Sequence, residues 1–521
     1  MDKNLELIKS EINNLNILSK MNNIDEIIKR SSILIKKFPK IQIFYNFLGS
    51  SLEKKNQIYD AEIVYIKSLK VDPNNIFALI NLGRISRIIN NLQRSEELFK
   101  QVLDLEPENL LAQLNYGELK IDQNKFKEAI LIFEKIYEKN KDFQNIIMRL
   151  ANTYSMIGEF KKAEEYLSIV SKKNPELFAA DYRLSNIINY SERKDHQQLI
   201  LEKIQNTKFD NINKHPLYFA IAKSYEDQKD YEQAFKYMEL GNKERNKLVI
   251  GNPLRYEEFF LNKNKEIFSN IDIKENANND FYNKKLIFIV GLPRSGTTLL
   301  HQILSAHSET YGVGESIILN VFFFKNLVND NFLKNLKKDN KINTENSREI
   351  SLKLGKNYDY FDLNKIKIDK APSNFFWIGF ISTLFPNSKI IHIKRNIKDN
   401  CLSIYKNVFG GNRTDWTYDI TNIKKYVKIY KEMMNFWKNK IDKKIYEINY
   451  EDLVKNQEIE IRNLLNFCNL QFEQGCLNYH KSKNPIKTVS INQSRKPIYK
   501  DSIESNLKYK NFNNFFIYFF F

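Results

Sequence analysis

One loop in the second half of the chain combines residues that can bind an anionic group. The loop Gly291-Leu-Pro-Arg-Ser-Gly-Thr-Thr298 follows the apolar run 285–290 and precedes the helix-like run 299–304. This order predicts a buried strand, a glycine-containing loop and a helix. Backbone N–H groups and the positive end of the helix would then face an anion, and Arg294 would add a cation from inside the loop. The alternative is a glycine-containing turn without a ligand.

The loop differs from the nucleotide phosphate loop at one position. Its spacing matches Gly-x4-Gly-Lys-[ST], but Thr297 occupies the place of the lysine. An ATPase or GTPase would lose the cation that meets the outer phosphates of its nucleotide, and a nucleoside kinase would want the same lysine. The substitution therefore disfavours nucleotide hydrolases as well as nucleoside kinases.

A second anion site is predicted about a hundred residues further along the chain. The run Lys389–Ile393 is typical of a buried strand, and Arg395 lies at its carboxyl end, where open α/β sheets collect ligands. Ser403 follows on a helix predicted over Ile397–Tyr405. A guanidinium forms bidentate, charge-assisted hydrogen bonds with a phosphate, and a hydroxyl adds a donor. The two sites together favour a doubly phosphorylated adenosine over ATP; the alternative for Arg395 is a surface ion pair.

These motifs resemble the donor site of the sulfotransferases. Pro293-Arg-Ser-Gly-Thr-Thr298 is similar to their 5′-phosphosulfate loop, above all in tyrosylprotein sulfotransferases and their bacterial relatives, and the pair Arg395 and Ser403 resembles their 3′-phosphate site. The resemblance covers residues 285–499 and implies that the sulfate donor is 3′-phosphoadenosine 5′-phosphosulfate (PAPS). The loop residues that would bind its 5′ end are Arg294, Ser295, Gly296, Thr297 and Thr298.

A further stretch resembles the C-terminal donor-binding segment of the family. It consists of Tyr450-Glu-Asp-Leu453 and of residues 490–499. By position, the residues that the resemblance places near the adenosine or its 3′ phosphate are Tyr450, Ser490, Gln493 and Lys496.

One departure from the family concerns the 3′ site, where tyrosylprotein sulfotransferases carry a further arginine four residues past the serine. This chain has Asn407 there, with Lys406 beside it as a substitute cation.

Sulfuryl transfer requires a base for the acceptor and cations for the departing phosphate. Glu315, in Tyr311-Gly-Val-Gly-Glu-Ser316, matches the glutamate base of tyrosylprotein sulfotransferases, and a carboxylate can take a hydroxyl proton. Lys370 matches the family lysine that stabilises the transferring sulfonate, and Arg294 is the third predicted catalytic residue. His307 is the rival base, because cytosolic sulfotransferases use a histidine, but we expect it to end the helix after the loop. The alternative for Glu315 and Lys370 is a solvated surface position.

The composition of the chain bears on its number of domains, its partners and its metal content. Its 521 residues predict two or three domains, and its net charge of +18 is spread over many lysines, which favours a solvated surface over a nucleic-acid partner. The three cysteines form no Cys-x-x-Cys pair, and the six histidines form no metal-ligand pattern, so we predict no metal.

The first twenty residues lack the features of a signal peptide, and no apolar stretch is long enough to span a bilayer. We expect a cytoplasmic protein without a membrane span.

The first half of the chain repeats with a period of 34 residues. Small residues recur at Gly49, Gly83, Gly117 and Ala151, and twelve positions later at Ala61, Ser95, Ala129 and Ala163. Four positions further on stand Tyr65, Phe99, Phe133 and Leu167. This order resembles the tetratricopeptide repeat (TPR), in which two antiparallel helices meet at small residues. Degenerate copies are predicted before Pro39 and around Ala222 and Ala234.

The sequence thus predicts an all-α TPR solenoid followed by a P-loop-type α/β domain with a central parallel sheet. The predicted bounds are 1–245 for the repeats, 246–284 for a connecting segment that loses the repeat register, and 285–521 for the sulfotransferase domain.

The concave groove of the repeats predicts a protein or peptide partner; a scaffold or dimer contact is the alternative. The predicted reaction is sulfuryl transfer from PAPS to a hydroxyl of a protein tyrosine or a carbohydrate. The rival function is a non-catalytic TPR interaction protein whose second domain binds a nucleotide.

Overall fold

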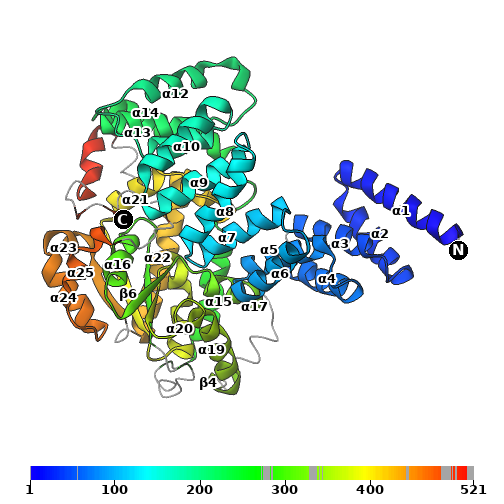
Figure 1. Cartoon of the computed structure of the whole chain (residues 1–521). Coiled ribbons are helices and arrows are strands. Elements are labelled where there is room, and N and C mark those ends of the chain that lie inside the picture. The colour runs from blue at the N-terminus through cyan, green and yellow to red at the C-terminus, as the bar shows by residue number, and fades with distance from the viewer. Residues whose placement is uncertain are drawn as a thin grey trace. The chain divides into compact units, whose positions relative to one another are not determined.

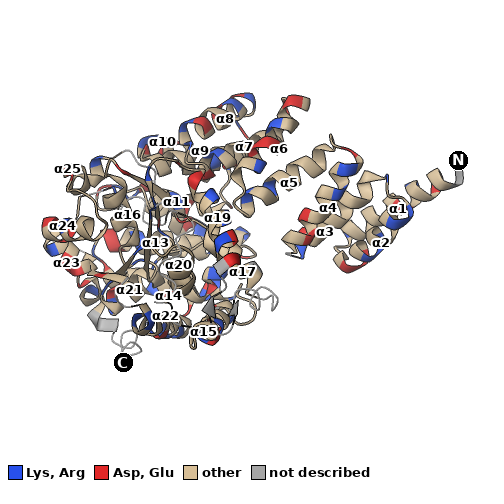
Figure 2. Ribbon diagram, turned by 90° about the horizontal axis from the view of Figure 1, so that it is seen from below, with Lys and Arg blue, Asp and Glu red and all other residues tan. Residues whose placement is uncertain are grey.

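The protein forms two compact units, Met1–Lys141 and Asp142–Phe521. The computed structural model describes residues 2–55, 57–271, 273, 282, 285–327, 337–338, 341–342, 344–441, 445–482, 488, 494–495, 497–498 and 502–512. Figure 1 labels many of the helices and some of the strands, and Figure 2 shows basic and acidic residues interspersed along the helices. The fold prediction is confirmed, because helical repeats precede a domain with a central parallel sheet. The predicted domain bounds stay a prediction.

The first unit is built of paired helices. They are α1 (Asp2–Lys20), α2 (Ile24–Lys37), α3 (Gln42–Lys54), α4 (Ile58–Val71), α5 (Ile76–Ile88), α6 (Leu92–Leu105), α7 (Leu110–Asp122) and α8 (Phe126–Lys139). Asn75 and Asn109, which are 34 residues apart, cap α5 and α7 by accepting a hydrogen bond from the backbone N–H three residues on. The repeat is therefore visible in the helix caps as well as in the apolar residues.

The recurring glycines mark the places where the paired helices come closest. A Cβ atom built on Gly83 would lie 2.7 Å from the ring of Phe99, and one on Gly117 would lie 2.2 Å from the ring of Phe133. Both rings are completely buried. Since an added methyl group would overlap the ring, the pairing of a small residue with an aromatic residue sixteen positions later is a packing requirement of the repeat.

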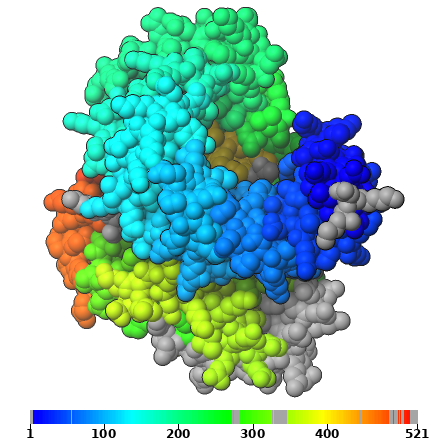
Figure 3. Space-filling view, turned by 45° about the vertical axis from the view of Figure 1, so that its right-hand side comes forward, coloured from blue at the N-terminus to red at the C-terminus, as the bar shows by residue number. Residues whose placement is uncertain are grey.

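The second unit begins with further helices of the same kind. They are α9 (Gln144–Ile157), α10 (Phe160–Lys173), α11 (Phe178–Ser185), α12 (Asp195–Gln205), the 3₁₀ helix η1 (Thr207–Phe209), α13 (His215–Asp227) and α14 (Tyr231–Asn246). In the space-filling view these helices form one packed surface, coloured cyan to green (Figure 3). A buried polar network joins three of them, because Asp181 of α11 accepts hydrogen bonds from Ser171 at 2.6 Å and from Lys203 at 2.8 Å. These charge-assisted bonds offset the cost of burying the carboxylate.

Helix α15 (Arg255–Phe268) lies inside the segment that was predicted to connect the two halves. Its side chains Phe260 and Phe268 are buried in the same core as Trp377 and Trp437. The ring of Phe268 lies 5.3 Å from that of Trp437 in an edge-to-face arrangement. This part of the chain is therefore an integral layer of the second unit.

A five-stranded parallel sheet lies at the centre of the second unit. Its strands are β1 (Leu286–Gly291), β2 (Thr310–Gly314), β5 (Ile366–Asp369), β6 (Lys389–Lys394) and β7 (Ile445–Asn449). They lie in the order β2-β5-β1-β6-β7, and every neighbouring pair is parallel. Strand β1 is the middle strand and all six of its residues are buried, as its apolar run predicts. A separate two-stranded antiparallel sheet pairs β3 (Lys337–Lys338) with β4 (Lys341–Ile342).

Helices cover both faces of the parallel sheet. Ile287 and Ile289 of β1 point into a core shared with α16 (Thr297–Ser305) and α24 (Gln457–Phe467). Phe288 and Val290 point to the other side, into a core shared with α15, α20 (Ile378–Leu384) and α22 (Ile420–Ile441). This alternation follows from the two-residue period of a strand. The remaining elements are α17 (Ile318–Asn326), α19 (Thr344–Asp359), η3 (Pro372–Trp377), α21 (Ile397–Tyr405), η4 (Asn412–Tyr418), α23 (Tyr450–Lys455), α25 (Gln474–Leu477), η6 (Tyr479–Lys481) and η8 (Ser505–Phe512).

Among the described helices, none combines the length and the apolar character needed to cross a membrane.

Candidate active site

Each strand of the parallel sheet ends beside a residue or loop that the sequence analysis identified. In sheet order these are Glu315 after β2, Lys370 after β5, the loop 292–296 after β1, Arg395 after β6 and Tyr450 after β7. Because the strands are parallel, their carboxyl ends lie at one edge of the sheet. Ligands of open α/β sheets bind at this edge. The strand order thus brings together residues that lie up to 158 positions apart in the chain, from Leu292 to Tyr450.

The loop after β1 has the backbone of an anion-binding turn. Arg294 and Gly296 both have positive φ angles, 68° and 106°, and helix α16 begins directly afterwards at Thr297. A Cβ atom on Gly296 would lie 2.6 Å from the ring of Tyr450, so this turn leaves no room for a side chain. The Ser295 hydroxyl is buried and finds no hydrogen-bond partner among the described residues. Backbone N–H groups, a hydroxyl and the first turn of α16 therefore surround a place suited to an anion.

The two predicted anion sites touch each other. The Arg294 Nε donates a hydrogen bond to the Ser403 hydroxyl at 3.1 Å, and the Arg395 Nη1 donates one to the Arg294 carbonyl at 3.0 Å. The second terminal nitrogen of Arg395 donates to the Ser502 carbonyl at 2.6 Å. The guanidinium of Arg395 also lies over the Tyr450 ring, 4.8 Å from its centre. These contacts fix the plane of the Arg395 fork beside the loop.

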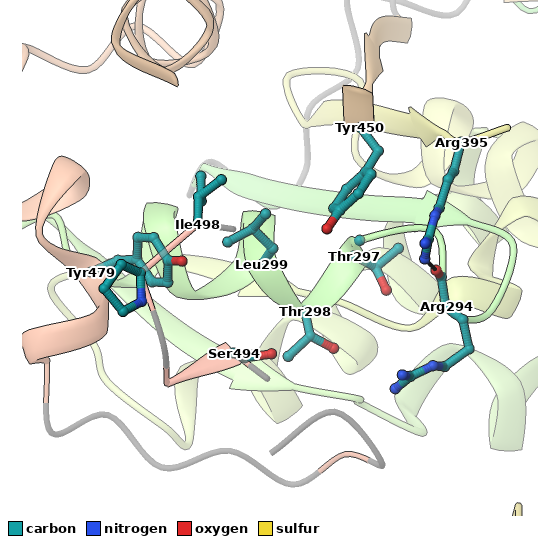
Figure 4. A pocket seen from close by; sticks show the side chains of 11 residues that line it. Arg294, Thr297, Thr298, Leu299, Arg395, Tyr450, Tyr479, Ser494 and Ile498 are labelled. Carbon is teal, nitrogen blue, oxygen red and sulfur yellow. Dashed lines mark hydrogen bonds between the residues drawn. The ribbon is translucent and has the colours of Figure 1, made fainter. Parts of the chain in front are cut away.

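An open pocket lies over this loop, and its empty space of about 570 Å³ includes solvent at its mouth. Figure 4 shows the cationic side chains of Arg294 and Arg395 at one end of it and the apolar side chains of Leu299 and Ile498 toward the other. The full lining consists of Arg294, Gly296, Thr297, Thr298, Leu299, Arg395, Tyr450, Tyr479, Ser494, Pro497 and Ile498. A ligand with an aromatic ring and anionic groups suits this division.

Glu315 and Lys370 form an ion pair at the neighbouring part of the same edge. The Lys370 ammonium donates a hydrogen bond to the Glu315 carboxylate, and the Lys370 backbone N–H donates one to the Gly314 carbonyl at 2.9 Å. The Lys370 side chain is only 1% exposed, whereas that of Glu315 is 46% exposed. The pair therefore presents a carboxylate to solvent while a buried cation holds it in place. Such a carboxylate can accept a proton from an incoming hydroxyl.

Two buried residues that sequence reasoning did not identify lie next to this ion pair, His301 through its bond to Gly314 and Asp369 as the neighbour of Lys370 in the chain. His301 of α16 accepts a hydrogen bond from the Gly314 backbone N–H at 3.2 Å. Burial, and to a lesser degree the charge of Lys370, lowers the pKa of His301 to about 3, which keeps its ring neutral as this acceptor role requires. Asp369 accepts a hydrogen bond from the Tyr358 hydroxyl at 2.6 Å, and burial raises the pKa of Asp369 to about 7. Asp369 precedes Lys370 in the same motif, but nothing in the sequence shows that it is buried.

His307 lies at the amino ends of the strands, whereas Glu315 lies at their carboxyl ends. It follows α16 and precedes the amino end of β2, whereas Glu315 follows the carboxyl end of that strand. The His307 Nε2 donates a hydrogen bond to the Gln471 carbonyl at 2.8 Å, and its Nδ1 accepts one from the Glu309 backbone N–H at 3.1 Å. The His307 ring thus joins the connection between α16 and β2 to the loop that contains Gln471.

The remaining site predictions have different outcomes. Ser490, Gln493 and Lys496 lie outside the described residues. Lys406, considered as a substitute cation for the 3′ site, instead forms an ion pair with Glu226 of α13 at 2.7 Å. In the part of the chain that the structure describes, no group of His, Cys, Asp or Glu side chains could hold a metal ion.

Family models match both halves of the chain. Residues 287–474 match a sulfotransferase family. Residues 44–75, 90–136, 120–183 and 215–245 match tetratricopeptide-repeat models. The last of these matches confirms the repeat copy predicted around Ala222 and Ala234.

Relatives of the chain include two whose names state an activity. An uncharacterized protein of Aquifex aeolicus (strain VF5) is 30% identical over 406 residues, which cover 75% of this chain and 52% of that protein. A putative protein-tyrosine sulfotransferase of Caenorhabditis briggsae is 30% identical over 209 residues, covering 38% of this chain and 70% of that protein. Protein-tyrosine sulfotransferase 1 of Danio rerio is 24% identical over 234 residues, covering 41% and 61% of the two chains. This chain spans about half the length of the Aquifex relative.

Proposed function

Because the chain belongs to the sulfotransferase family, we propose that it transfers the sulfuryl group of PAPS to a hydroxyl group of an acceptor. One observation carries the proposal. A single edge of the sheet joins two anion-binding groups, the loop with Arg294 and the guanidinium of Arg395, to the ion pair of Glu315 and Lys370. The first two suit a donor with two anionic ends, and the pair suits proton removal from an acceptor.

The pocket supports PAPS as the donor. PAPS carries a phosphosulfate on one side of its ribose and a phosphate on the other, with adenine as its apolar part. The buried Ser295 hydroxyl and the Arg395 Nε find no hydrogen-bond partner among the described residues, so both have capacity for a ligand oxygen. We assign the 5′ group to Arg294–Thr298 and the 3′ phosphate to Arg395 and Ser403. Tyr450, Leu299 and Ile498 would contact the adenosine.

The roles of the chain's own groups follow from their exposure and charge. PAPS supplies the sulfuryl group, which passes to the acceptor oxygen as its bond to the donor phosphate breaks. Glu315 takes the proton of the acceptor hydroxyl, and its half-exposed side chain leaves room for that approach. Lys370 and Arg294 offset the negative charge that develops during transfer, and their hydrogen bonds hold them in position beforehand.

We propose a protein tyrosine as the first acceptor to test and a protein or peptide as the partner of the repeats. The names of the Caenorhabditis and Danio relatives support the first choice, and the repeat matches support the second. We also propose a reducing, cytoplasmic setting, because Cys401, Cys468 and Cys476 are all buried and unpaired thiols.

Transfer of radioactive sulfate from PAPS tests this proposal. We expect label on a tyrosine peptide and none on the same peptide with phenylalanine in place of tyrosine. Glu315→Gln should lower kcat by about 10² to 10⁴. The matched control is Glu309→Gln, an exposed glutamate at the opposite end of β2, which should leave kcat unchanged. Label on a carbohydrate alone would overturn the tyrosine acceptor, and failure both to bind and to consume PAPS would overturn the function.

A further inference from the structure

Three of the described residues after Ser482 form one wall of the donor pocket. We call Ser494, Arg495, Pro497, Ile498 and 502–509 the C-terminal segment. Ser494, Pro497 and Ile498 line the pocket directly, and Figure 4 shows Ser494 and Ile498 beside it. This wall comes from a part of the chain beyond residues 287–474, which match the family model, although residues 490–499 resemble the family's C-terminal donor-binding segment. The contacts that hold it in place are given by the structure.

The segment is bound to the site residues themselves at Ser502. The Ser502 carbonyl accepts a hydrogen bond from Arg395 at 2.6 Å, and its hydroxyl lies 2.7 Å from the hydroxyl of Tyr450. Asp399, buried on α21, accepts four further hydrogen bonds from residues 504–506 at 2.7 to 3.0 Å. The position of this segment thus bears directly on the orientation of Arg395 and Tyr450.

One anchor of the segment lies on repeat helix α9. The Arg495 Nη2 donates a hydrogen bond to the Met156 carbonyl at 2.7 Å, at the end of the helix, where carbonyls lack partners within the helix. Gly158, which ends α9 with a φ of 87°, lies beneath the guanidinium, and a Cβ atom there would be 2.9 Å from the Arg495 Nε. A cation at the carboxyl end of a helix also interacts favourably with the helix dipole.

A second anchor lies on repeat helices α13 and α14. The Tyr509 side chain is buried, with its ring 5.3 Å from that of Tyr231 in an edge-to-face contact. Its hydroxyl donates a hydrogen bond to Glu226 of α13 at 3.1 Å, and Glu226 also pairs with Lys406 at 2.7 Å. The Glu226 carboxylate therefore joins the C-terminal segment to Lys406, which directly follows the helix that carries Ser403. The segment is shown in red beside the repeat helices in Figure 1.

We propose that Arg495 and Tyr509 are positioning residues of the donor site, which hold the C-terminal segment on repeat helices α9, α13 and α14. The inference rests on the proposed donor function. It gives these repeat helices a role in binding the nucleotide, in addition to any role in recruiting a partner. Without the anchors the segment would keep only its contacts with Arg395, Tyr450 and Asp399, and the cost of ordering the rest of it on nucleotide binding would weaken the affinity.

The affinity of the full chain for adenosine 3′,5′-bisphosphate, measured by calorimetry, tests the inference. We expect Arg495→Met to weaken the Kd about tenfold and Tyr509→Phe, which removes one hydroxyl, about threefold. Arg495→Lys should recover part of the loss, because lysine can still donate to the Met156 carbonyl. Arg193→Met is the matched control, since Arg193 lies on the repeats with a side chain 47% exposed and pairs with Glu164.

Two further readouts separate positioning from misfolding. The KM for PAPS should rise in Arg495→Met while kcat at saturating PAPS stays within about twofold, because the reacting groups lie on the strand ends. A merely unfolded fraction would lower kcat and leave the Kd unchanged. In the parent protein the bisphosphate should also slow amide hydrogen exchange at the end of α9, and in Arg495→Met it should not, since coupling between two sites is reciprocal.

The outcomes of these experiments are distinct. If the parent protein does not bind the bisphosphate, both the proposed function and this inference fail. If the parent protein binds it and Arg495→Met and Tyr509→Phe bind it equally well, the donor function stands and the inference is overturned. If Arg495→Met does not fold, Tyr509→Phe and Arg495→Lys decide the question by the same Kd.

Discussion

Replacing Gly117 with alanine would place a methyl group inside the ring of Phe133. The added Cβ atom would lie 2.2 Å from the Cε1 atom and 2.7 Å from the Cζ atom of that ring, well below van der Waals contact. The ring is completely buried, so it has no space into which to turn. Overpacking of this kind costs up to about 3 kcal/mol. Alanine is about 1 kcal/mol better than glycine inside a helix, so we expect a net destabilisation of about 2 kcal/mol.

The fourth repeat shows how the loss can be compensated. At the corresponding positions it has Ala151 in place of glycine and Leu167 in place of the aromatic residue, and both are buried. We therefore expect Phe133→Leu, which alone should cost about 1 to 2 kcal/mol through the cavity that it leaves, to remove the clash of Gly117→Ala. In a double-mutant cycle the two substitutions should couple by about 2 kcal/mol.

Urea unfolding of the full chain, followed by two probes, measures this effect. The three tryptophans are Trp377, Trp416 and Trp437, all in the second unit, so their fluorescence reports on that unit. Far-ultraviolet circular dichroism reports on the helices of both units. Gly117→Ala should lower the unfolding midpoint by circular dichroism and leave the tryptophan midpoint in place. Strictly additive effects of the two substitutions would refute the packing argument.

The remaining predictions concern the edge of the sheet. Lys370→Met should lower kcat by about 10² to 10³ and leave the affinity for the bisphosphate unchanged, because Lys370 follows β5 whereas Arg395 follows β6. The control is Lys365→Met, which replaces an exposed lysine at the start of β5. Equal losses of kcat in both variants would contradict the role assigned to Lys370. Burial raises the pKa of Asp369 to about 7, so the folded state holds a proton that the unfolded state releases near pH 4. The free energy of unfolding of the parent protein should therefore fall as pH rises from about 4 to 7, and Asp369→Asn should flatten this dependence in urea titrations; an unchanged slope would show that Asp369 titrates normally.

The elements with strong local patterns were predictable from the sequence. The apolar run 285–290 predicted a strand that the structure has at Leu286–Gly291, and the helix predicted over Ile397–Tyr405 has those bounds. The repeat was readable because small and aromatic residues recur every 34 positions, each pair meeting at one helix crossing. In these cases the residues that determine the structure lie within a few turns of one another.

The features that depend on distant contacts were not predictable in this way. Helix α15 lies where the repeat register ends, and its place in the fold depends on Phe268 meeting Trp437. The site residues were named by resemblance, but their convergence follows from the strand order β2-β5-β1-β6-β7, which no local pattern contains. Likewise, Arg495 meets the Met156 carbonyl across 339 residues of chain.

Calorimetric binding of adenosine 3′,5′-bisphosphate and of ATP tests the central claim most directly. The account predicts that the protein prefers the bisphosphate and that Arg395→Ala weakens its binding about 10- to 100-fold, as expected for the loss of a charge-assisted hydrogen bond. Arg462→Ala, which removes an exposed arginine of α24 paired with Glu458, should leave the affinity unchanged. Equal or tighter binding of ATP, or bisphosphate binding that does not depend on Arg395, would contradict a sulfotransferase donor site at this edge of the sheet.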